Sequence, residues 1–316
     1  MKIKNYIAGD EIRILELFKT TFKKELSKEY WYWRFANNPA GNHKIKLMWE
    51  SDTLVGHYAV SPVKIRIGSD IYNSALSMTT MTHPDYSGKG IFGLLANDLY
   101  KDLEQNDNCM AIWGFPNNNS HYGFVKNLSW SNVGQISHLT LPKGKLLAKL
   151  SNNVSNCLSF DQEQVKCLRD IYYNKPVSLE ITEEYLNWRY IQNPTEKYYI
   201  FSTNNSPKPA FLVVKLYPQE DHFNQDVFIT EIGFTEDTFI YLSELLSHIL
   251  AYFRLTNSSI NLWMSIFDKR YILLEKLGFI AGGKPTYLGI RANNLIKEIV
   301  TDYRNWYISY GYSDIY

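Results

Sequence analysis

Residues 82–95 read Thr82-His83-Pro84-Asp85-Tyr86-Ser87-Gly88-Lys89-Gly90-Ile91-Phe92-Gly93-Leu94-Leu95 and join an extended segment (73–82) to an apolar run with helical spacing. The spacing predicts a helix over 92–104. The free amides of a helix's first turn and the helix dipole together attract anions. The three glycines let the backbone approach a ligand closely. The stretch therefore predicts a strand–turn–helix unit that binds a pyrophosphate.

Two other phosphate-binding loops fit this stretch poorly. A P-loop carries its lysine after the second glycine, whereas Lys89 lies between Gly88 and Gly90. The letters do match GxGxxG, but a dinucleotide-binding fold also needs an acidic residue at a strand end ~20 positions on. Asp107 instead lies in a polar turn.

The loop resembles the acetyl-CoA loop of the GNAT acyltransferase superfamily, commonly V-x-P-x-[YF]-R-G-x-G-[IL]-[GA]. Five positions match that form: Pro84, Tyr86, Gly88, Gly90 and Ile91. Two positions depart from it, because Ser87 stands where Arg or Gln is usual and Phe92 where Gly or Ala is usual. The alternative interpretation is an ordinary glycine-rich turn.

A second block, Pro116 to Trp130, is similar to the GNAT pattern N-x-x-[AS]-x-x-[FL]-Y-x-K-x-G-[FW]. The matching positions are Asn118, Phe124, Lys126, Leu128 and Trp130. Val125 occupies the place of the frequent general-acid tyrosine and cannot donate a proton. Tyr122 and His121 are the nearby substitutes, and we expect them to carry proton transfer.

The resemblance implies acetyl-CoA as co-substrate and no metal. Strand residues would pair with the pantetheine arm, and the loop would hold the pyrophosphate. The expected contacts are Thr80, Met81, Thr82, Ser87, Gly88, Lys89, Gly90, Ile91, Phe92, Gly93 and Asn118.

The chain repeats itself. Residues 27–39 recur as 182–194 at an offset of 155 (188 minus 33), and residues 124–130 recur as 273–279 at an offset of 149 (273 minus 124). Repeats at so long a period indicate duplicated domains. The predicted fold class is therefore α/β (α+β), with two tandem GNAT-like domains, 1–142 and 143–316. Each would be a mixed, mostly antiparallel twisted sheet flanked by helices.

The two units differ at the loop. Residues 229–239 of the second unit contain one glycine, and Glu236 and Asp237 stand where a pyrophosphate would bind. Carboxylates repel phosphates and suit the first turn of the expected following helix, 237–253. The second unit is therefore predicted to be degenerate and to bind no CoA.

Composition indicates a cytoplasmic globular protein. The 316 residues are 45% hydrophobic, and the formal net charge of +1 gives no basic footprint for nucleic acid. Three widely spaced cysteines (Cys109, Cys157, Cys167) indicate free thiols rather than a metal site. No apolar run approaches the ~20 residues of a membrane span. Oligomerisation stays open.

The order of elements follows from the patterning. Strands are expected at 44–50, 53–67, 70–82, 132–140 and 285–292, with a linker and the start of unit two over 141–180. The aromatic run from Tyr30 to Phe35 favours a core role over stacking on a sugar acceptor.

The resemblance implies direct acyl transfer from acetyl-CoA to an amine of a small molecule. The fragments W-x-W-[RK]-[FY]-x-x-N-P and F-P-N-x-N-S are similar to tandem GNAT proteins of bacterial polysaccharide assembly, which suggests an amino sugar as acceptor. Two alternatives stay open. They are a non-catalytic acyl-CoA sensor and a transferase that uses aminoacyl-tRNA.

Overall fold

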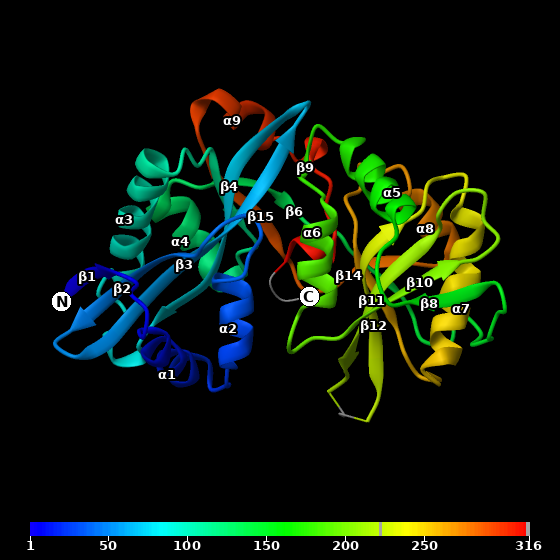
Figure 1. Ribbon diagram of the computed structural model, residues 1–316, viewed down its shortest axis with the longest axis horizontal. Helices are drawn as coiled ribbons and strands as arrows, with labels where there is room; N and C mark the ends of the chain where they lie inside the picture. Colours follow the sequence, from blue (N-terminus) through cyan, green and yellow to red (C-terminus); the bar gives the residue numbers. More distant parts are fainter. Residues whose placement is uncertain (221–222, 314–316) are drawn as a thin grey trace. The chain divides into compact units, whose positions relative to one another are not determined.

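The computed structural model describes residues 1–220 and 223–313, with the backbone alone for Asn119. The chain divides into two compact units. Unit one comprises Met1–Gly134, Asn193–Thr195 and Tyr287–Thr301. Unit two comprises Gln135–Gln192, Glu196–Thr286 and, from Asp302, the rest of the described chain. Each unit holds a mixed sheet with helices, which confirms the predicted fold class (Figure 1).

Unit one is built on a sheet in the order β1-β2-β3-β4-β5-β15-β6. Its strands are β1 (Lys2–Asn5), β2 (Lys44–Glu50), β3 (Thr53–Ile67), β4 (Asp70–Thr82), β5 (Ala111–Gly114), β15 (Tyr287–Ala292) and β6 (Ser131–Gln135). Strands β4 and β5 pair in parallel, and β15 pairs antiparallel with β5. The helices are α1 (Glu11–Phe22), α2 (Lys28–Phe35), α3 (Ile91–Asn106), α4 (Asn118–Leu128) and α9 (Asn294–Val300).

Two apolar layers cover this sheet. One contains Leu95 and Leu99 of α3, packed with Val55 and Ala75 of the sheet. The other contains Trp31 and Phe35 of α2, together with side chains of α1, β2 and β3. Three aromatic side chains of α2, Trp31, Trp33 and Phe35, are buried and belong to the core, as expected, whereas Tyr32 is exposed.

Unit two repeats the plan with the sheet order β14-β7-β13-β12-β11-β10-β8. Its strands are β7 (His138–Leu141), β8 (Val154–Cys157), β10 (Tyr198–Thr203), β11 (Phe211–Pro218), β12 (Gln225–Gly233), β13 (Ile260–Trp263) and β14 (Ile280–Gly282), and a short strand, β9 (Val177–Leu179), lies in the same part of the chain. Strands β12 and β13 pair in parallel. The helices are α5 (Gln162–Tyr173), α6 (Glu183–Leu186), α7 (Leu242–Tyr252) and α8 (Tyr271–Leu277).

Three expectations about elements need correction. The strand expected over 132–140 is two strands, β6 and β7, which belong to different sheets. The helix expected over 237–253 begins only at Leu242 as α7, after a 3₁₀ turn (Phe239–Tyr241), so Glu236 and Asp237 lie before its first turn. The strand expected over 285–292 is β15, which lies in the sheet of unit one. Hydrophobic alternation predicts that a strand exists but does not specify its partner. The single boundary between residues 142 and 143 stays a prediction about the duplicated sequence.

Across residues 1–220 and 223–313, no helix has both the length and the apolar character needed to cross a bilayer. Nor does this part of the chain group three or more His, Cys, Asp or Glu side chains in a way that could hold a metal ion.

Candidate functional site

The glycine loop leads from β4 into α3. After a single 3₁₀ turn (Pro84–Tyr86), Gly88 and Gly90 adopt left-handed φ angles of 76° and 74°. Such angles favour glycine, since a side chain strains them. The Leu94 amide donates to the Gly90 carbonyl at 3.1 Å, which opens the hydrogen-bond ladder of α3. The three preceding amides, from Ile91 to Gly93, lie before that ladder and can bind a ligand.

The surface above the loop is open. A Cβ atom at Gly88, Gly90 or Gly93 would meet no atom of the described chain within 4 Å. Lys89 places its ammonium 4.3 Å from the centre of the Tyr86 ring. The loop therefore offers backbone amides and a cation to an approaching anion.

The first turn of α3 is seated against β3 by a further glycine. A Cβ atom at Gly56 would collide with the side chain of Ile91. Further along the helix, the Lys46 ammonium of β2 pairs with Asp98 and Asp102 at 2.7 and 2.5 Å. The close approach at Gly56 and the ion pairs of Lys46 thus fix the position of α3, and of the glycine loop at its start, relative to the sheet.

Strand β4 continues past its partner β5. Their parallel pairing ends at Leu76↔Trp113, whereas β4 runs on to Thr82. The His83 amide donates to the Val55 carbonyl of β3 at 2.9 Å, so the backbone of His83 faces β3. Because neighbouring residues of a strand turn their backbone groups in opposite directions, Thr82 and Thr80 face the other edge. That edge can pair with an extended ligand.

A β-bulge precedes this edge. The register of β3 with β4 passes from Ala59↔Met78 to His57↔Met81, so β4 carries one extra residue. Thr79 adopts a left-handed φ of 51° at this point. Its carbonyl oxygen accepts a hydrogen bond of 2.7 Å from Nδ1 of His57. The bulge shifts the alternation by one residue, so that the Met81 side chain is buried and the backbone groups of Thr80 and Thr82 face away from β3.

Helix α4 packs on the first turn of α3 through Phe124, whose ring lies 5.1 Å from that of Phe92. Asn118 begins this helix and is exposed. His121 stacks on Tyr287 of β15 with ring centres 4.1 Å apart, and its Nε2 is buried without a hydrogen-bond partner among the described residues. Tyr122 is 64% exposed, and its hydroxyl accepts a 2.6 Å bond from the Lys126 ammonium.

The corresponding strand end of unit two is occupied by a side chain of the protein. Strand β12 also extends beyond its parallel partner, since its pairing with β13 ends at Ile229↔Leu262 whereas β12 runs on to Gly233. The Arg270 guanidinium donates to the carbonyls of Ile232 and Phe234 at 3.4 and 3.2 Å. Asp268 holds this guanidinium with bonds of 3.0 and 2.7 Å.

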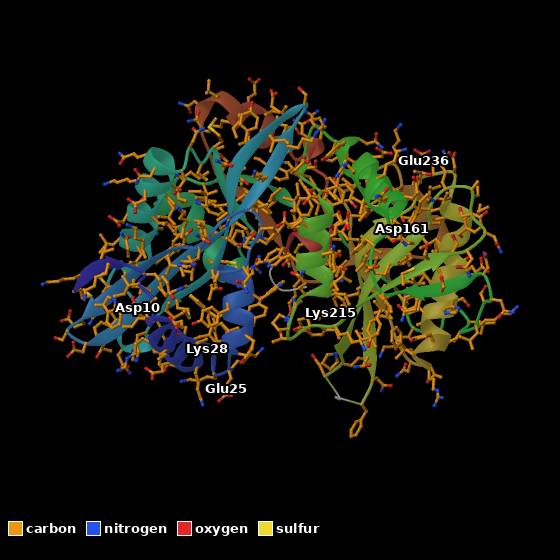
Figure 2. All side chains as sticks on the ribbon, in the orientation of Figure 1. Asp10, Glu25, Lys28, Asp161, Lys215 and Glu236 are labelled. Carbon is orange, nitrogen blue, oxygen red and sulfur yellow. The ribbon has the colours of Figure 1, made fainter. Side chains whose placement is uncertain are left out.

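The space around Arg270 is a pocket of about 520 Å³ with mixed charge. Lys175 and Lys269 line it together with Glu236 and Asp237. Glu236, labelled in Figure 2, is exposed, and Asp237 pairs with Lys208 at 3.1 Å. The loop of unit two thus presents carboxylates where unit one presents free amides.

Sequence reasoning located the loop but missed the roles of Gly56 and His57 in unit one and of Arg270 in unit two. Gly56, His57 and Arg270 belong to no motif, since each acts through a contact between separate strands or loops. A signal existed for Gly56 alone, because an isolated glycine inside a strand pattern often marks close backbone approach.

Comparisons with known proteins agree with this geometry. Residues 2–132 match the family model described as "Acetyltransferase (GNAT) domain". Among curated proteins, none matches the sequence.

Solved structures share the fold over most of their length. A conserved protein of unknown function from Enterococcus faecalis has 11% identity and a TM-score of 0.68, covering 94% of this chain and 74% of that chain. A GCN5-related N-acetyltransferase from Anabaena variabilis has 12% identity and a TM-score of 0.66, covering 95% and 75%. N-myristoyltransferase of Saccharomyces cerevisiae, solved with myristoyl-CoA, has 12% identity and a TM-score of 0.62, covering 92% and 83%.

Proposed function

We propose, from the match of residues 2–132 to the GNAT domain model, that the chain is a GNAT acyltransferase that transfers an acetyl group from acetyl-CoA to an amine of a small molecule. The observation that carries the proposal is the open glycine loop at the start of α3, next to the outward edge of β4. An anion site beside a strand edge suits a ligand that carries both a pyrophosphate and amide groups, as CoA does.

The residues present fit that co-substrate. The amides of residues 91–93 and the Lys89 ammonium bind the pyrophosphate, and the open space over the glycines admits it. The backbone of Thr80 and Thr82 pairs with the pantetheine amides, and Met81 anchors the strand in the core. Asn118 offers an exposed amide at the start of α4. Acetyl-CoA supplies an activated thioester when bound. An outward amide of β4 then stabilises the negative charge that develops on the carbonyl oxygen.

Two side chains of α4 are proposed for proton transfer. Tyr122 protonates the departing thiolate, and its hydroxyl is already oriented by Lys126. His121 is the second candidate for this role, since its buried Nε2 lacks a partner in the described chain. A buried polar atom without a partner is uncommon and calls for an explanation, which proton transfer supplies. The attacking amine gives up its own proton to a carboxylate, to a histidine or to an ordered water.

A single acyl-CoA site per chain is part of the proposal. In unit two the Arg270 side chain bonds the β12 carbonyls, and Glu236 and Asp237 repel phosphate. For the acceptor we propose an amino sugar, on the analogy of the polysaccharide-linked sequence fragments. We place the reaction in the cytoplasm, where the three free cysteines stay reduced.

Calorimetric titration with acetyl-CoA and with CoA tests the proposal first. We expect one site per chain. Turnover with a panel of amines, amino sugars included, then separates an enzyme from an acyl-CoA sensor, because a sensor binds without releasing free thiol. Acetyl-CoA and longer acyl-CoAs are compared in the same assay. Binding of neither nucleotide would overturn the assignment, and activity only with aminoacyl-tRNA would favour that alternative.

A further inference from the structure

His57 is a buried histidine with a single hydrogen bond. The residue lies on β3 with its side chain fully buried, and its Nδ1 lies 2.7 Å from the Thr79 carbonyl oxygen. Burial lowers its pKa to about 4, so the ring is neutral at physiological pH. A neutral ring that bonds a carbonyl through Nδ1 carries its proton there, which leaves Nε2 as an acceptor. That Nε2 is buried and has no hydrogen-bond partner in the part of the chain that the structure describes.

This arrangement costs stability. Its neighbours in the sheet are apolar, with Leu47 opposite on β2 and Met81 opposite on β4. An unpaired buried nitrogen loses its hydration, and a leucine would fill the same space without that loss. Packing therefore does not account for a histidine at this position. The bond to Thr79 does.

Thr79 is the residue whose backbone conformation needs to be stabilised. A left-handed φ is strained for a β-branched residue. If β4 relaxed to regular extended geometry, its pairing with β3 could no longer accommodate the extra residue of the bulge. The alternation beyond it would then slip by one position, and Thr80 and Thr82 would turn toward β3.

We propose that His57 is a positioning residue for acyl transfer, which holds the Thr79 bulge so that the amides of Thr80 and Thr82 face the acyl donor. The inference rests on the proposed function for its catalytic consequence, but its structural part stands alone. His57 touches no reacting atom. It acts through the direction of the backbone donors that follow the bulge.

The test compares two replacements of His57. His57→Leu fills the space without a donor, so the bulge loses its hydrogen bond. His57→Asn can place an amide N–H near the position of Nδ1 and keep that bond. We expect turnover to fall about 100-fold in His57→Leu and to recover most of the loss in His57→Asn, because a misdirected donor costs about that factor. The dissociation constant for CoA should change less than threefold, since the glycine loop is untouched.

Thr79→Gly provides a second, independent line. Glycine accepts the left-handed angle without strain, so adding Thr79→Gly to His57→Leu should restore at least tenfold of the lost turnover. As a matched control, His43 bonds the carbonyl of Phe35, the last residue of α2, at 2.9 Å through Nδ1. His43→Leu should leave turnover within twofold of the unmodified protein.

Hydrogen–deuterium exchange of the peptide 76–83 gives a readout that needs no activity. Protection should fall at least tenfold in His57→Leu and return in His57→Asn. Unchanged exchange, or turnover within twofold of the unmodified protein in His57→Leu, would overturn the proposal. If the unmodified protein neither binds CoA nor turns over, the proposed function fails, and the exchange result still decides the role of His57.

Discussion

The two units carry the same strand frame, and they finish it differently. In each, the key strand pairs antiparallel with the strand before it and parallel with the strand after it: β4 with β3 and β5, and β12 with β11 and β13. In unit one this strand ends at open glycines. In unit two the Arg270 guanidinium sits on the carbonyls of the strand end. In the described residues, the duplicated strand arrangement thus ends at open backbone in unit one and at a bound guanidinium in unit two.

The largest effect should come from a charge in the open loop. Gly90→Glu places a carboxylate beside the amides at the start of α3, where it repels a pyrophosphate, and we expect CoA binding to weaken at least 100-fold by calorimetry. Gly68→Glu is the matched control, since Gly68 has a similar φ of 61° and equally open space at a distant hairpin. Equal affinities in the two variants would remove the loop as the binding site.

Arg270 should matter to the stability of unit two. In Arg270→Met the Asp268 carboxylate, only 13% exposed, stays charged without its partner. Breaking such a pair costs about 3–5 kcal/mol of unfolding free energy, measured by urea denaturation. Arg304 pairs with Asp302 at the same sequence spacing on the surface, so Arg304→Met should change nothing measurable. CoA stoichiometry should stay at one in Arg270→Met, because Glu236 and Asp237 remain. A second site would show that Arg270 alone excludes the ligand.

Each unit also buries a carboxylate among tyrosines, with opposite results. Burial acts to raise the pKa of Glu11 in unit one, but hydrogen bonds, including those from the Tyr32 and Tyr6 hydroxyls and the Gly9 amide, outweigh it and lower the pKa to about 2. In unit two, burial dominates and raises the pKa of Glu231 to about 7, against the hydroxyls of Tyr190 and Tyr172.

These shifts predict opposite pH dependences of stability. The contribution of Glu231 is present below its ordinary pKa of 4.5 and is lost as pH rises through about 7. The contribution of Glu11 is present above 4.5 and is lost as pH falls toward about 2. Relative to the unmodified protein, Glu231→Gln should therefore gain roughly 3 kcal/mol in unfolding free energy between pH 4 and pH 8. The unfolding free energy of Glu11→Gln, relative to that of the unmodified protein, should fall as pH rises from 2 to 6. Parallel curves for the two variants would contradict the assignment.

Tyr122 and Tyr271, which stand two residues before the repeated blocks 124–130 and 273–279, form another contrast. Tyr122 is exposed on α4, whereas Tyr271 is buried at the start of α8. If Tyr122 protonates the thiolate, Tyr122→Phe should slow turnover about 100-fold and leave CoA affinity unchanged. Tyr271→Phe should leave turnover unchanged. Normal turnover in Tyr122→Phe would move the role to His121 or to water.

The smallest expected effect separates binding from stability. Gly93 has room for a Cβ atom, and its φ is not left-handed. Gly93→Ala should stabilise α3 by about 0.5–1 kcal/mol, because alanine favours a helix. The added methyl occupies the surface that the pyrophosphate approaches, so CoA affinity should fall several-fold. A gain in thermal stability without a loss of affinity would place the ligand elsewhere on the loop.

Local patterns predicted the first and last residues of three consecutive strands in unit one. Strands β2, β3 and β4 begin and end where alternation and turn residues place them, and the turns hold left-handed residues at Ser51 and Gly68. Helix α5 was missed, although Asp161 and Gln164 form a capping box at its start (Figure 2 labels Asp161).

The site was predictable only in part, for a physical reason. The loop is a contiguous stretch, so its glycines could be read directly from the sequence. The His57–Thr79 bond joins residues 22 positions apart, and Arg270 reaches carbonyls 36 and 38 positions away. Such contacts depend on strand register, which the residues near each partner do not specify.

Strand β15 is translated after β5 and after all of residues 115–286, yet it pairs with β5 inside the sheet of unit one. Until residues 287–292 appear, β5 exposes an unpaired edge to every other growing strand in the cell. The region 2–132 that matches the family model therefore completes its sheet only when residues 287–292 are available. Before β15 is synthesised, the folding of this region depends on protection of the exposed edge of β5.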